Sequence, residues 1–155
     1  MALYSASNTL GGTQQALSTS YKTLLALTAA TATLTGARLF DVTLGADGTP
    51  ADNVLTYDIS RQTAAGTSTA VTPTQLDLQA RAAGTVGAAN FTAEGTITAA
   101  SSVLSITANQ RATYRWVTQP ELGFVIPATN LAGFAVRAKS PAYTGTAVAT
   151  GLFLE

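Results

Sequence analysis

The chain of 155 residues is long enough for one domain with a hydrophobic core, but short for two. Charged residues make up only 10% of it, and eight basic residues balance eight acidic ones. This balance gives no net field that would draw the protein to nucleic acid or to an anionic membrane. Because a surface poor in charge favours association, the composition predicts a protein that packs against neighbours; a low-charge monomer is the alternative.

The sequence predicts a protein made in a reducing cytoplasm. It has no cysteine, so disulfides and thiolate chemistry are not available to it. Its first residues, MALYSASNTLGG, lack the basic and apolar regions of a secretory signal. The uncharged stretch between Lys22 and Arg38 is rich in Thr and shorter than the roughly 20 apolar residues of a membrane span, so no membrane contact is expected.

Residues 1–18 are small and polar and include the pair Gly11 and Gly12. This composition is typical of a frayed terminus, or of an extended arm that becomes ordered on a neighbouring molecule. The apolar residues that such an arm would dock are Leu3, Tyr4 and Leu10. We expect an arm over residues 1–18, followed by one domain over residues 19–155.

Residues 14–34, QQALSTSYKTLLALTAATATL, leave two structures open. Leu17, Tyr21, Leu24 and Thr28 would form one stripe of a helix. The many β-branched Thr residues lower helix propensity and favour a strand.

The next two segments alternate as β-strands do. In ARLFDVTLG (37–45) and NVLTYDISR (53–61), apolar and polar residues alternate along most of the segment. One face carries Arg38, Phe40, Val42 and Leu44 in the first segment, and Leu55, Tyr57 and Ile59 in the second. The opposite face carries Leu39, Asp41 and Thr43, and then Thr56, Asp58 and Ser60, so both aspartates are expected to point outward. ADGTPADN between the two segments has the residues of a turn.

Short segments rich in Val and Thr, separated by Gly, Pro, Asn or Ser, continue to the end of the chain. Many short strands at this spacing are typical of a sandwich or barrel. The sequence therefore predicts an all-β fold, a single-domain antiparallel jelly roll or related β-sandwich.

The segment NQRATYRWVTQPE (109–121) concentrates cations and aromatics, as a nucleic-acid site would. Alternation separates them, however: Tyr114 and Trp116 share one face of a strand, and Arg111 and Arg115 share the other. A platform for single-stranded nucleic acid needs both kinds on one exposed face, so no nucleic-acid partner is predicted. We expect the aromatics in the core, and the two arginines, about 13 Å apart, to contact different partners in a sister subunit or another protein.

No catalytic residue, cofactor or metal site is predicted. The chain has no His, which together with the lack of Cys excludes Ser-His and Cys-His pairs and ordinary zinc sites. TLGADGT does not match a phosphate-binding loop. A catalytic carboxylate pair would have to come from Asp41, Asp58, Asp77, Glu94 and Glu121, but solvated or salt-bridged carboxylates are the simpler interpretation. Asp47, Asp52 and Asn53 are possible calcium ligands, although a plain turn explains them as well.

Three stretches resemble a family of small structural proteins of tailed bacteriophages. They are GADGTPADNVLTYDISRQTAAGTSTAVTP, NQRATYRWVTQPELGFVIPATN and AVRAKSPAYTGTAVATGLFLE. MALYSASNTLGGTQQALS is similar to the start of such proteins. The resemblance implies a jelly-roll virion protein that decorates or cements the outer surface of the capsid as a homodimer or homotrimer. Its partners would then be the major capsid protein and itself. The family supplies no catalytic residue.

Other functions stay open. The chain is also compatible with another virion component, at the head-tail junction, in the tail or beside a fibre. A carbohydrate-binding module is a further alternative, because β-sandwiches often bind glycans through exposed aromatics. A glycosidase is the least expected.

Overall fold

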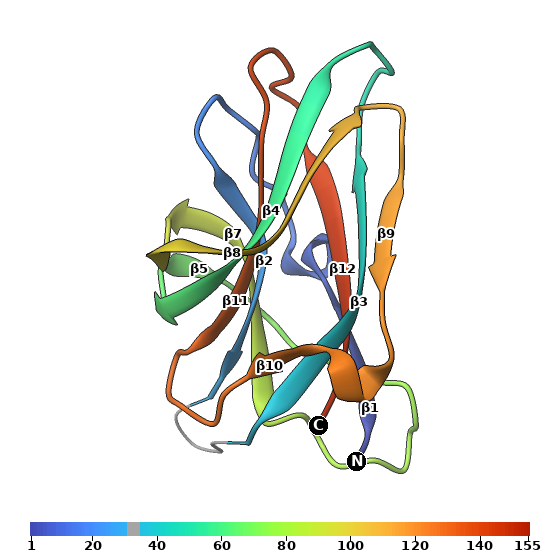
Figure 1. The fold of residues 1–155 in the computed structure, drawn as a ribbon, viewed down its shortest axis with the longest axis vertical. Helices are drawn as coiled ribbons and strands as arrows, with labels where there is room; N and C mark the ends of the chain where they lie inside the picture. Colours follow the sequence, from blue (N-terminus) through green and yellow to red (C-terminus); the bar gives the residue numbers. More distant parts are fainter. Residues whose placement is uncertain (31–34) are drawn as a thin grey trace.

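The protein is a sandwich of two antiparallel β-sheets (Figure 1). The computed structural model describes residues 1–30 and 35–155. Strands hold 58% of the residues and helices 5%, which confirms the predicted all-β sandwich.

The first sheet, sheet A, has six strands. Its order is β10 (Phe124–Ile126), β3 (Ala37–Ala46), β12 (Ala147–Leu154), β1 (Leu3–Ser7) and β6 (Thr74–Gln75), with β9 (Tyr114–Val117) also on β3. Strands β9 and β10 pair with successive parts of the same edge of β3. The short 3-10 helix η2 (Pro120–Leu122) connects them.

The second sheet, sheet B, also has six strands. Its order is β5 (Thr67–Val71), β7 (Thr85–Ala93), β2 (Lys22–Ala29), β11 (Gly133–Lys139), β4 (Val54–Ala64) and β8 (Thr96–Asn109). The inward faces of the two sheets enclose one core, as alternation along the strands requires. Its largest fully buried side chains are Tyr4, Phe91, Phe134, Phe153, Leu25, Leu27, Leu39, Leu44, Leu55, Ile59, Ile126 and Val42.

The expected arm over residues 1–18 is wrong for its first part, because residues 3–7 are strand β1 of sheet A. This strand pairs with β12 from Leu3 opposite Leu154 to Ser7 opposite Thr150. Tyr4 is fully buried and stacks on Phe153 with ring centroids 5.3 Å apart. The 3-10 helix η1 (Asn8–Gly11) follows β1 directly. The beginning of the chain is therefore part of the sandwich and contributes to its core.

A β-bulge in β3 changes which residues face the core. The ladder with β12 places Leu152 opposite Asp41 and Phe153 opposite Leu39, so Phe40 has no partner in β12. Leu39 is fully buried on the same side as Val42 and Leu44, whereas strict alternation assigned Phe40 to that side. The prediction was wrong before the bulge because one extra residue reverses the alternation. Asp41, expected to be solvated or salt-bridged on the outward face, is 2% exposed and pairs with Arg115.

The segment with two possible structures contains a strand. Residues 22–29 form β2, in the centre of sheet B, and seven of its eight residues are buried. Such a strand is apolar on both faces, which explains why its sequence lacks alternation. The last part of the segment, residues 31–34, lies outside the described residues.

Candidate interaction surfaces

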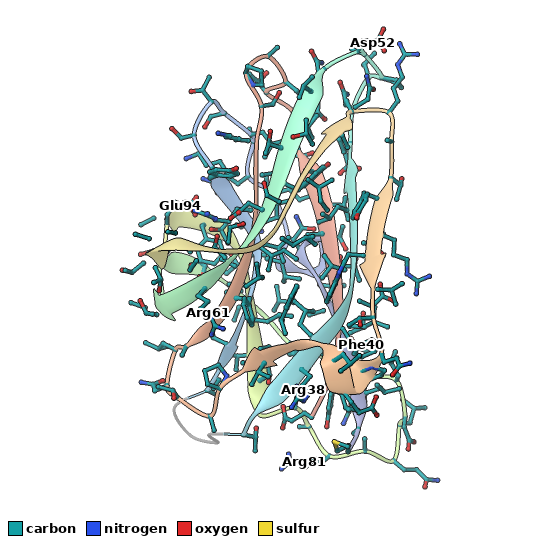
Figure 2. The ribbon with its side chains drawn as sticks, in the orientation of Figure 1. Arg38, Phe40, Asp52, Arg61, Arg81 and Glu94 are labelled. Carbon is teal, nitrogen blue, oxygen red and sulfur yellow. The ribbon has the colours of Figure 1, made fainter. Side chains whose placement is uncertain are left out.

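The five residues predicted to make an assembly interface do not lie on one surface. Tyr4 is wrong as a docking residue, because its ring is buried and its hydroxyl donates to the Arg81 carbonyl at 2.9 Å. Leu3 lies on the neighbouring position of β1, at the end of the sandwich where Arg81 is found (Figure 2). Arg111 pairs with Asp52, which Figure 2 shows at the opposite end.

The remaining two predicted residues, Leu10 and Arg115, lie on different elements of the sandwich. Leu10 is 61% exposed on η1, which contacts β5 and β7, whereas Arg115 is on β9 at the edge of β3. Contact of Leu3, Leu10, Arg111 or Arg115 with another molecule stays a prediction.

Strand β9 has the two faces that its alternation predicts. Tyr114 and Trp116 pack against the core, and Arg115 and Val117 point outward. Trp116 stacks on Phe124 with centroids 4.3 Å apart and an interplanar angle of 2°. One face of its indole ring is therefore covered within the protein.

Each outward arginine has a carboxylate partner in its own chain. Arg115 donates from Nε to Oδ1 of Asp41 at 3.0 Å and also binds Oδ2. The hydrogen bonds to Asp41 raise the pKa of Arg115. Arg111 lies 3.4 Å from Asp52, with both side chains exposed, an arrangement that contributes little to stability. Arg115 thus makes several hydrogen bonds to a buried carboxylate, whereas Arg111 makes one solvent-exposed ion pair.

A second carboxylate is buried on the outer face of sheet B. Asp58 points to that face, as predicted, but is only 4% exposed because Arg137 covers it. Its carboxylate accepts from Arg137 Nε at 3.0 Å and from Ser60 Oγ at 2.6 Å. Burial raises the pKa of Asp58, but hydrogen bonds from Ser102, Ser60 and Arg137 outweigh burial and lower the pKa overall.

Tyr21 covers this ion pair from outside. The guanidinium of Arg137 and the ammonium of Lys139 each lie 4.6 Å from the centre of its ring. Burial, followed by the charge of Asp58, raises the pKa of Tyr21. The cluster is a closed network in which the aspartate is already paired, so it stabilises the sheet.

Two of the other carboxylates considered for chemistry have separate structural contacts. Glu94 accepts from the backbone N–H of Thr23 at 3.1 Å, and Asp77 accepts from the N–H of Gln79 at 2.9 Å. Among residues 1–30 and 35–155, no group of three or more His, Cys, Asp or Glu is arranged to hold a metal ion.

Figure 1 shows residues 1 and 155 at the same end of the sandwich, and exposed apolar residues line hollows beside them. We define the basal surface as Met1, Leu3, Leu76, Leu78 and Val125; all are exposed, with Met1 at 96% and Leu78 at 92%. Three shallow hollows border Met1, and other residues of the basal surface line two of them. The sequence placed only Leu3 of this set in an interface, because the set comes from separate parts of the chain.

Charged groups border the basal surface. Arg38 lines the hollow that contains Val125, and Arg81 and Glu155 line the next one. Arg81 pairs with Glu155 at 2.8 Å, and the Glu155 carboxylate also accepts from the N–H groups of Gly84 and Thr85. An apolar centre with a charged rim is the usual anatomy of a protein–protein interface.

No helix within the described parts of the chain is long and apolar enough to cross a membrane. Comparisons of the chain with known protein families, curated proteins and solved structures found no match.

Proposed function

We propose that this protein is a non-enzymatic structural component of a tailed-phage virion, and that it decorates the outer surface of the head. In this role it binds the major capsid protein, associates with further copies of itself and stabilises the expanded shell. The proposal starts from the sequence resemblance described above. The structural observation that supports it best is the basal surface, which offers an apolar contact at one end of a rigid sandwich.

The rest of the molecule is compatible with a clamp between capsid subunits. The ion pairs Asp41–Arg115 and Asp58–Arg137, each with a buried carboxylate, join neighbouring strands within the two sheets. A clamp needs many modest contacts that symmetry repeats, since repetition converts weak single contacts into high avidity.

Binding to heads tests this function. Purified protein is mixed with expanded heads that lack it, sedimented with them and quantified, and the melting temperature of the heads is recorded. We expect saturable binding and a higher melting temperature. Heads that neither bind the protein nor gain stability would overturn the decoration role. Binding to tails alone would assign the protein to another position in the virion.

A pair of matched variants tests the basal surface. Leu78→Asp places a charge in its apolar part, and Leu10→Asp makes the same change on η1. Both side chains are well exposed, so both variants are expected to fold. We expect Leu78→Asp to weaken head binding at least tenfold; binding by Leu10→Asp tests separately the contact predicted for Leu10. Loss of binding in Leu10→Asp alone would move the contact to η1.

The carbohydrate-binding alternative gives a different result. A glycan array would show binding by the isolated protein, and that binding would be lost when an aromatic on the outside of the sandwich, such as Tyr21, is replaced by Ala. Binding of this kind without binding to heads would favour a glycan module over decoration.

A further inference from the structure

Strand β8 forms one edge of sheet B and pairs there only with β4. From Leu104 opposite Ile59 to Asn109 opposite Val54, the pairing advances one residue at a time without a bulge. Alternate residues of such a strand direct their N–H and C=O groups away from the neighbour. No other strand of the described chain pairs with this side of β8, so these groups form a regular row at the surface.

The two halves of β8 differ in how well their outer edge is protected against pairing with a further strand. Between Ile97 and Ser102 the strand advances five residues while β4 advances two, and Ala100 has a φ of 54°. Such a bulge bends an edge and prevents another strand from pairing with it. The half from residue 104 to residue 109 has no bulge and remains straight.

Charge and proline, the other usual protections of an edge, are absent from the whole strand. Its sequence, TITAASSVLSITAN, contains no charged residue, no proline and no glycine, and the nearest charges along the chain are Glu94 and Arg111. The other outer strands are shorter: β6 has two residues, β10 three, β9 four and β5 five. Natural proteins seldom leave an uncharged edge of this length without a partner.

We propose that this edge pairs with the same edge of a second copy of the chain. The two β8 strands run antiparallel around a two-fold axis at Ile106, over residues 104–108 of each copy. The two six-stranded sheets then form one continuous sheet across the dimer. The inference concerns the chain by itself and does not depend on a role in a virion.

The side chains of β8 suit this register. The axis places Leu104 opposite Ala108 of the second copy and Ile106 opposite itself. These three residues are partly buried against the core, so their pairing extends the apolar layer from one copy to the other. On the outer face, exposed Ser105 lies opposite exposed Thr107. Apolar pairs on one face and hydroxyl pairs on the other are the combinations that stabilise antiparallel sheets.

A second copy fits this edge better than an unrelated strand for two reasons. Two-fold symmetry gives each strand a partner of the same length and the same lack of charge, so no like charges oppose each other in any register. The segment also has the β-branched residues that pleated sheets favour.

Sedimentation velocity across a dilution series provides the first test. We expect a species of twice the 15.7 kDa chain mass at high concentration, and its dissociation on dilution. A protein that remains monomeric at every concentration tested would overturn the proposal.

Paired charges test the register. Because Ser105 faces Thr107 of the second copy, Ser105→Lys with Thr107→Lys places two lysine pairs opposite each other. Ser105→Lys with Thr107→Glu places Lys opposite Glu twice in the same positions. We expect the first double variant to be monomeric and the second to dimerise. Both lose the contact between Ser105 and Tyr21, so that loss does not account for a difference between them.

Other results of the charge test count against the proposal. A dimeric Lys–Lys variant would place the interface elsewhere. A folded but monomeric Lys–Glu variant would overturn the register at Ile106. If either variant unfolds, hydrogen exchange of the wild-type protein decides: the outward amides of residues 104–108 should exchange at least tenfold more slowly at high concentration than after dilution. Equal exchange rates would overturn the proposal.

Discussion

The guanidinium of Arg115 on β9 binds the carboxylate of Asp41 on β3, and these two residues join an edge strand of sheet A to its neighbour. The Asp41 side chain is only 3% exposed, whereas that of Arg115 is 62% exposed. The exposed guanidinium therefore covers a buried carboxylate.

Replacing Arg115 with Glu should destabilise the protein, because it brings a second carboxylate to a buried one. We expect a lower midpoint of urea unfolding, measured by circular dichroism. Arg111→Glu is the control, since its partner Asp52 is exposed and the midpoint should stay close to that of the wild type. An unchanged midpoint in Arg115→Glu, together with weaker assembly, would show that Arg115 serves an interface instead.

Tyr4→Ala should cost about 3–5 kcal/mol of unfolding free energy, because it leaves a cavity beside Phe153. Leu10→Ala, six residues further along the chain, should change stability by less than about 0.5 kcal/mol, since Leu10 is exposed. Chemical denaturation of the two variants measures the difference. Equal stability would mean that residues 3–7 are an arm in solution and that β1 does not pair with β12.

The stability of the protein should fall in acid partly through Asp58. The folded protein has a lowered Asp58 pKa, so the carboxylate contributes its full stability above its unfolded pKa of about 3.9 and loses it as the pH falls through the folded pKa. Asp58→Asn removes this dependence. We expect the wild type to have the higher melting temperature at pH 7 and the difference to shrink below about pH 4. A difference that grows in acid would contradict the lowered pKa.

The Glu155 side chain fixes the loop between β6 and β7. It is 1% exposed and accepts from Gly84, Thr85 and the hydroxyl of Thr35. Burial raises the pKa of Glu155, but these hydrogen bonds lower it overall. Glu155→Ala leaves buried N–H groups without an acceptor, which should cost about 1–3 kcal/mol in unfolding free energy.

Arg81→Ala is the matched control for Glu155→Ala. It removes only the ion pair of a 61% exposed arginine, and such surface pairs contribute at most about 1 kcal/mol. Thermal unfolding of both variants compares the two effects. A larger loss in Arg81→Ala would show that the ion pair, and not the backbone contacts, holds the loop.

Local alternation was sufficient to predict the fold class and several strands. The second predicted segment matches β4, with Leu55, Tyr57 and Ile59 in the core. The parity of Tyr114 and Trp116 was also correct, because β9 has no bulge. These features depend only on neighbours along the chain, and a sequence displays them directly.

Features that depend on distant residues were missed. The strand β1 was taken for an arm because its partner β12 lies at the other end of the sequence, although the alternation of Tyr4 and Ala6 was a usable signal. The burial of Asp58 depends on Arg137, which is 79 residues away. The basal surface brings together Leu3, Leu76 and Val125 from three parts of the chain, and no local pattern indicates that they meet.

The central position of β12 determines the order in which the protein can fold during synthesis. β12 lies between β3 and β1, and Ala2 and Glu155 exchange backbone hydrogen bonds at 2.6 and 3.0 Å. Until residue 154 has left the ribosome, β1 lacks its main partner and Tyr4 has no Phe153 on which to stack. β1 is thus secured only after the strands between it and β12 have been made, and Tyr4 lacks its stacking partner during their synthesis. Such a chain is expected to fold slowly and to benefit from a chaperone that shields its N-terminal residues.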